Sequence, residues 1–138
     1  MLDRYPVKKF LQIFLWLVAI HSCLVGLFLI VLPESWLTFF GYIGYRRTFF
    51  QVQGGIFHLV MAITYSCTAR DPLREQTLVI ISICAKGIAT VFLLLYYLLI
   101  EPVWIVLVSA LGDVLMGAVI LISFIFIKKN NPPAEEAG

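Results

Sequence analysis

Charged residues are scarce in this sequence. Only 13% of its 138 residues are Asp, Glu, Lys or Arg, and 62% are hydrophobic, whereas about a quarter of a typical soluble domain is charged and about half is apolar. The mean hydropathy is +0.99. These proportions exclude an ordinary soluble domain, and they indicate a protein that is surrounded by lipid.

Sequence signatures of catalysis are also missing. The three cysteines, Cys23, Cys67 and Cys84, form no C-x-x-C pair, which argues against a disulfide framework or a thiol-disulfide enzyme. The sequence has no H-E-x-x-H zinc motif, no phosphate-binding loop and no serine nucleophile elbow. No basic stripe accompanies an aromatic platform, so we expect no nucleic-acid partner. No motif of the sequence indicates an enzyme, although catalysis by residues outside these motifs stays open.

The sequence does contain four long apolar runs. They cover residues 10–32, 50–69, 77–100 and 103–127, and each is close to the ~20 residues that an α-helix needs to cross the hydrocarbon layer of a bilayer. The segments LPES, ARDP and IEP interrupt them. We predict an all-α fold, a four-transmembrane-helix bundle in one membrane domain of residues 1–127, followed by a polar tail of residues 128–138.

The basic residues outside the runs indicate the orientation of the chain. One side has seven of them and the other has only Arg46 and Arg47. Because basic residues accumulate on the cytoplasmic side of membrane proteins, both termini are predicted to be cytoplasmic. The first run has no A-x-A-like cleavage site, so we expect it to be retained as a span. The seven cytoplasmic residues are Arg4, Lys8, Lys9, Arg70, Arg74, Lys128 and Lys129.

The one long loop on the outer side is aromatic. Its sequence, PESWLTFFGYIGYRR, contains Trp36, Phe39, Phe40, Tyr42 and Tyr45. Aromatic residues of this kind anchor proteins at the interface between membrane and water. We therefore expect an aromatic belt, on a short interfacial helix that begins at Ser35.

Lys86, inside the third run, is the main candidate for a functional residue. At ~1.5 Å per helical residue, Lys86 lies ~21 Å from the outer end of its helix, Asp113 ~15 Å, His21 ~16 Å and His58 ~12 Å. Four titratable side chains thus share a layer near the midplane. Because an ionised side chain at the bilayer centre costs about 3 kcal/mol or more, we expect Lys86 and Asp113 to pair with each other.

Further polar residues extend this layer toward the outer surface. Arg47, Gln51 and His58 share one face of the second predicted helix, because residues four and eleven apart lie on the same side. Gly54 and Gly55 on the same helix leave space beside these side chains. The pattern predicts a polar cavity that opens to the outer side. His21 completes this cavity, and its other lining residues are Arg47, Gln51, His58, Tyr97 and Asp113.

Three interpretations of this cluster stay open. A cavity of this kind can bind a small hydrophobic ligand or relay protons. In the second interpretation the chain is a non-catalytic accessory or assembly subunit of a membrane complex, or part of a homo-oligomer, and the polar groups only join helices. In the third, His21 and His58 hold a haem b from both sides. Beyond that haem, the spacing predicts no metal site and no resident cofactor.

The segments FFQVQGGIFHLVMAITYSCTARDP, CAKGIATVF and SALGDVLMGAVIL resemble small four-span bacterial membrane proteins of the DoxX-like kind. The likeness covers the last three predicted helices. It implies a location in the bacterial inner membrane. It also implies the four-span fold, but no reaction. DoxX-like proteins are associated with quinone-linked or redox-related membrane complexes, and a quinone as ligand and subunits of a membrane complex as partners stay open for this chain. The resemblance gives no residue of this chain a functional role.

Overall fold

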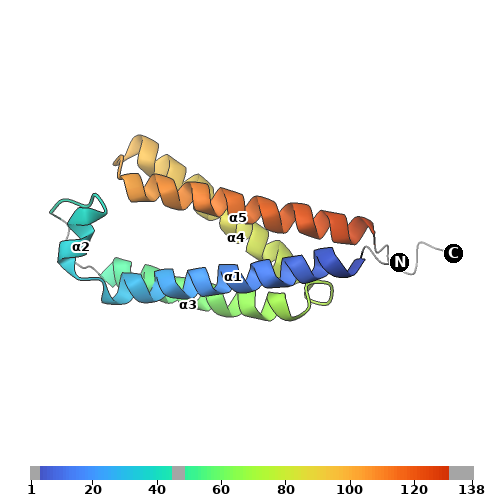
Figure 1. The fold of residues 1–138 in the computed structure, drawn as a ribbon. Helices are drawn as coiled ribbons and strands as arrows, with labels where there is room; N and C mark the ends of the chain where they lie inside the picture. The colour runs from blue at the N-terminus through green and yellow to red at the C-terminus, as the bar shows by residue number, and fades with distance from the viewer. Residues whose placement is uncertain (1–3, 45–48, 131–138) are drawn as a thin grey trace.

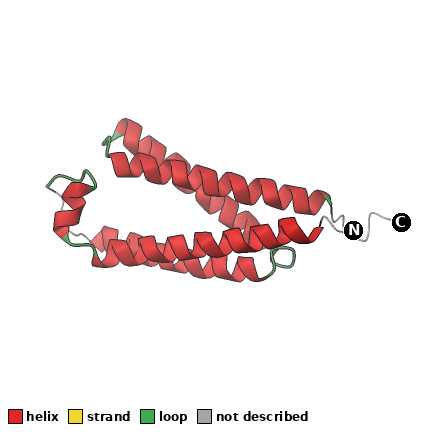
Figure 2. Cartoon of the chain, in the orientation of Figure 1, coloured by secondary structure: helices red, strands yellow, loops and turns green. Residues whose placement is uncertain are grey.

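The structure, a computed structural model, describes residues 4–44 and 49–130. Within these ranges the regular elements are all α-helices, and Figure 2 shows them joined by short loops, without a strand. The predicted all-α class is confirmed. The helices are α1 (Arg4–Val31), α2 (Glu34–Phe39), α3 (Phe49–Arg70), α4 (Gln76–Leu99) and α5 (Trp104–Lys129).

Three helices in the described part of the chain are long and apolar enough to cross a membrane. They are Pro6–Val31, Gln76–Leu99 and Trp104–Lys129, and they make the chain an integral membrane protein. The remaining long helix, α3, has 22 residues but is not one of the three. Its apolar surface is interrupted by Gln51, Gln53, His58, Thr64, Ser66 and Thr68.

The helices do not end where the apolar runs end. α1 begins at Arg4, before the run that starts at residue 10, and α5 continues to Lys129. A helix is held by backbone hydrogen bonds, so it extends through polar residues beyond the hydrocarbon layer. α2 starts at Glu34 after Pro33, and the predicted start at Ser35 was wrong. Proline suits this position because its fixed φ and its missing N–H are tolerated where a helix begins.

The long helices form two pairs. α1 packs along α3 and α4 packs along α5, and the pairs contact each other through α1 with α5 and through α3 with α4. In Figure 1 the pairs lie close together at the end with the start of α1 and the end of α5, and they diverge toward the end that carries α2. We call these the terminal end and the α2 end.

The buried apolar core lies toward the terminal end. It contains residues from all four long helices, and its packing joins the two pairs. Between membrane helices this attraction comes mainly from van der Waals contact, because lipid tails are as apolar as the side chains. The core residues are Leu11, Leu15, Val18, Ala19, Tyr65, Ala69, Val79, Ile120, Phe124 and Ile127.

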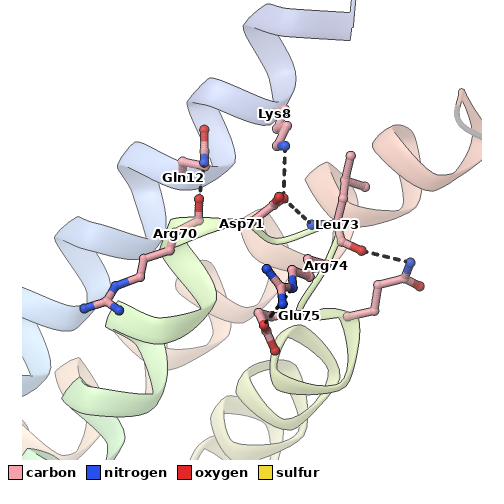
Figure 3. A network of polar contacts seen from close by, with 8 residues as sticks. Lys8, Gln12, Arg70, Asp71, Leu73, Arg74 and Glu75 are labelled. Carbon is pink, nitrogen blue, oxygen red and sulfur yellow. Dashed lines mark hydrogen bonds and ion pairs between the residues drawn. The ribbon is translucent and has the colours of Figure 1, made fainter.

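Polar contacts also close the terminal end, as Figure 3 shows. Lys8 Nζ lies 2.9 Å from Asp71 Oδ1, and Gln12 Nε2 donates a hydrogen bond of 2.7 Å to the carbonyl oxygen of Arg70. The backbone N–H of Leu73 donates to Asp71 Oδ1 at 3.3 Å. These contacts join the first turns of α1 to the loop between α3 and α4.

The contact between Lys8 and Asp71 gives a pH-dependent prediction. The hydrogen bond from Lys8 lowers the pKa of Asp71, so the contact stabilises the fold above the unfolded pKa of this carboxyl and loses its effect as pH falls through the lowered pKa. We expect Asp71→Asn to reduce the free energy of unfolding by at most about 1 kcal/mol at neutral pH, because both side chains are partly exposed. Unfolding in mixed micelles at neutral and at strongly acidic pH measures this, and an equal loss at both would contradict it.

Aromatic rings close the α2 end. Phe28 of α1 makes edge-to-face contacts with Trp36 and Phe40, at centroid distances of 6.2 and 5.4 Å. Phe40 also lies 6.1 Å from the ring of Trp104 on α5. Trp36 of α2 therefore contacts α1, and Phe40, the residue after α2, contacts both α1 and α5. The aromatic belt stays a prediction, and its Tyr45 lies outside the described residues.

Candidate functional site

Lys86 and Asp113 form a buried ion pair. Lys86 Nζ lies 2.6 Å from Asp113 Oδ1, and the two side chains are only 6% and 13% exposed. The structure therefore has the ion pair that the depth argument predicted. α4 and α5 come close here because Gly117 has no side chain: an added Cβ would lie 3.2 Å from the Cβ of Lys86. Each charge thus has its counter-ion inside the protein, as hydrocarbon surroundings require.

Tyr65 on α3 is a third member of this cluster. Its ring centroid lies 5.5 Å from Lys86 Nζ, within the range of a cation–π interaction, which is strongest where water is excluded. The residue is 2% exposed. The sequence prediction left Tyr65 out of the site. Its position seven residues after His58, on the same helix face, is the signal that could have found it.

His58 on α3 is held by Ser22 on α1. Ser22 Oγ donates to the carbonyl oxygen of His58 at 3.0 Å and lies 3.3 Å from His58 Nδ1. A hydroxyl has one proton, so both contacts form together when the neutral ring carries its proton on Nδ1 and donates it to Ser22 Oγ. In the neutral ring, Nε2 is then an unprotonated acceptor.

These side chains line a cavity of about 500 Å³ between the two helix pairs. The volume is in the range of small-molecule sites, about 300 to 1,000 Å³. Lys86, Asp113 and Tyr65 form its polar floor, and most of the other lining is apolar. The remaining lining residues are Ser22, Leu29, Gly54, Phe57, His58, Met61, Ala85, Ile88, Ala89 and Phe92.

Only part of the predicted lining is present. His58 and Asp113 line the cavity, whereas Gln51 and Tyr97 do not. Gln51 Nε2 instead donates to the carbonyl oxygen of Leu29 on α1, at 3.0 Å. The side-chain amide predicted to line the cavity thus donates to the backbone of the neighbouring helix. Arg47 lies outside the described residues.

His21 does not complete the pocket. Its side chain is exposed and is not part of the cavity lining. α1 contributes Ser22 in its place. A porphyrin held from both sides needs both imidazoles in one cavity, and only His58 lines this one, so these residues do not fit the bis-histidine arrangement. In the described ranges no three His, Cys, Asp or Glu side chains gather as a metal site, and the three cysteines are free.

Comparison with known proteins identifies no relative. No protein-family model matches the chain, and no curated protein and no solved structure matches it either. The resemblance to DoxX-like proteins stays a prediction.

Proposed function

We propose that the chain crosses the bilayer four times and that the cavity beside the Lys86–Asp113 pair binds a small ligand. The observation that carries this proposal is a space of about 500 Å³ bordered by a buried ion pair. Polar groups that only join helices act through close contact and need no such space. The ion pair in this site positions hydrogen-bond donors and acceptors toward the cavity.

The fourth span is α3. At 1.5 Å per residue its 22 residues reach about 33 Å, enough to cross the hydrocarbon layer. Five of the six polar side chains named above have partners within the protein. Thr64, Ser66 and Thr68 donate to carbonyl oxygens of their own helix, while Gln51 and His58 contact α1. Polar residues satisfied in this way are compatible with a span.

The arrangement of the ends supports an even number of crossings. α1 begins at the same end of the molecule at which α5 finishes (Figure 1). Basic residues lie at this end, among them Lys8, Arg74 and Lys128, and this excess supports a cytoplasmic location for it. Both termini are then cytoplasmic.

Cysteine labelling tests this orientation. In a background with the three native cysteines replaced by alanine, we expect Thr38→Cys to react in intact cells with a thiol reagent that does not cross the membrane. Asn130→Cys should react only after permeabilisation. The opposite pattern would reverse the orientation and leave the helix pairs unchanged.

Ligand binding is favoured over a proton relay. A relay needs hydrogen-bonding groups that continue from the floor to a surface. Gln51 and Tyr97, which were predicted to supply this continuation, do not line the cavity. Much of the lining is apolar, which suits a bound molecule better than a proton path.

Purification with bound small molecules tests the proposed function. We expect mass spectrometry to detect a small molecule bound to the native protein and to lose it in the paired variant Lys86→Met with Asp113→Leu, which strands no charge and should fold. An absorption spectrum of the same sample tests haem and quinone. Partner subunits that remain bound to both proteins, with no small molecule in either, would instead favour the accessory-subunit alternative.

A further inference from the structure

The cavity borders lipid between α3 and α4. Phe57 of α3 and Ile88 and Phe92 of α4 line it, and they are 68%, 71% and 61% exposed. Ile88 stands near the middle of the 24-residue helix α4. Exposed side chains at that depth border hydrocarbon, not water. The mouth of the cavity is therefore on the side of the molecule.

Helix contacts close the cavity within each helix pair and at the terminal end. α1 and α3 approach so closely that an added Cβ at Gly55 would lie 2.7 Å from the carbonyl oxygen of Gly26. α4 and α5 are joined by the Lys86–Asp113 pair, and the core closes the terminal end. α3 and α4 contact each other less extensively than α1 and α3 do, and the exposed lining residues Phe57, Ile88 and Phe92 lie on these two helices.

The charges of the floor cancel. Lys86 and Asp113 neutralise each other at 2.6 Å, so a ligand with a net charge would be buried without a counter-ion, which is unfavourable in an apolar medium. An ammonium has three N–H donors, and one is directed at Asp113. With its proton on Nδ1, toward Ser22, His58 offers an acceptor at Nε2. The floor thus complements an uncharged head that both accepts and donates hydrogen bonds.

We propose that the cavity takes an uncharged, lipid-soluble amphiphile that enters sideways from the bilayer between α3 and α4. Its head, a hydroxyl or a hydroxyl with a carbonyl, lies between Lys86 and His58. Its apolar chain lies along Phe57, Ile88 and Phe92 toward the mouth. This inference rests on the proposed function, because it names the class of ligand for the same site.

Three probes with the same apolar chain test the head group. 1-Oleoylglycerol is uncharged, oleate is an anion and oleylamine is a cation. We expect native mass spectrometry of the protein to show binding of 1-oleoylglycerol at least tenfold tighter than that of either charged probe. His58→Ala should weaken it at least fivefold, while His21→Ala, on the exposed side of α1, should leave it unchanged.

A pair of matched substitutions on α4 tests the lateral mouth. Ile88→Trp places an indole ring at a residue that lines the cavity, and Val91→Trp places the same ring three residues away, at an exposed residue outside the lining. We expect the first to slow uptake of 1-oleoylglycerol from phosphatidylcholine vesicles at least fivefold and the second to have no effect. Equal rates for the two variants would overturn the lateral entry.

The outcomes separate this inference from the proposed function. Binding of oleate or oleylamine as tight as that of 1-oleoylglycerol overturns the uncharged class. If none of the three probes binds, but a water-soluble molecule co-purifies and is lost with Lys86→Met and Asp113→Leu, the amphiphile is wrong and the ligand site stands. If no small molecule binds at all, both proposals fall.

Discussion

Removal of either charge of the Lys86–Asp113 pair alone is expected to destabilise the protein by about 3–5 kcal/mol. Lys86→Met leaves the Asp113 carboxylate, 13% exposed, without the ammonium that now lies 2.6 Å from it. Asp113→Leu leaves the ammonium with the ring of Tyr65, 5.5 Å away, and a ring attracts a cation more weakly than a carboxylate does. In both cases an unpaired charge stays buried.

The paired change is expected to recover most of this loss. Lys86→Met with Asp113→Leu leaves no unpaired group, and apolar residues often replace a buried ion pair at little cost. The reversed pair, Lys86→Asp with Asp113→Lys, should also be more stable than either single variant. Equilibrium unfolding by SDS in mixed micelles gives the four free energies of a double-mutant cycle. Losses that simply add in the paired variant would contradict the prediction, because they would mean that the two charges do not act on each other.

The ion pair can be predicted from the sequence because the free-energy cost of an unpaired charge in hydrocarbon does not depend on the details of packing. Counting residues from the ends of apolar runs places Lys86 and Asp113 at similar depth, and a charge in hydrocarbon must find a counter-ion. The long helices follow from the same kind of argument, since run length and composition decide where a helix can lie in a bilayer. The ion pair and the long helices can thus both be predicted from positions along the membrane normal alone.

The lining of the cavity depends on how each helix is rotated about its axis, which depth does not determine. His21 and Ser22 are neighbours in sequence and lie at the same depth. Ser22 faces α3 because Gly26, four residues later on the same face, is the point where α1 meets Gly55 of α3. Leu29, whose carbonyl oxygen accepts from Gln51, continues this face. His21 is therefore turned away.

A signal for this rotation was available. Ser22 and Gly26 form a small-xxx-small pattern, and two glycines occur together on α3, a pattern typical of close contact between membrane helices. The prediction used the glycines only as space beside the polar residues of the second helix. Matching the two patterns would have paired Ser22 with His58 and removed His21 from the pocket.

Gly55→Ala is expected to destabilise the protein by about 2–3 kcal/mol, in the upper part of the usual range for overpacking. An added Cβ would lie 2.7 Å from both the carbonyl oxygen of Gly26 and Cγ1 of Ile30. The backbone oxygen cannot rotate away, so α1 and α3 must move apart. That movement stretches the hydrogen bonds from Ser22 to His58 and from Gln51 to Leu29. Gly26→Ala should act in the same way, since its Cβ would lie 2.7 Å from the carbonyl oxygen of Gly55.

Gly54, the residue before Gly55, provides the control for this substitution. An added Cβ at Gly54 meets nothing within 4 Å, so Gly54→Ala should be neutral or stabilise α3 by up to about 1 kcal/mol through helix propensity. Both substitutions change the propensity of the same helix by the same amount, and the difference between them isolates the contact with α1. Unfolding in mixed micelles measures this difference. If Gly55→Ala is as stable as Gly54→Ala, α1 and α3 are not held at this distance, and the rotation that brings Ser22 and His58 together loses its physical cause.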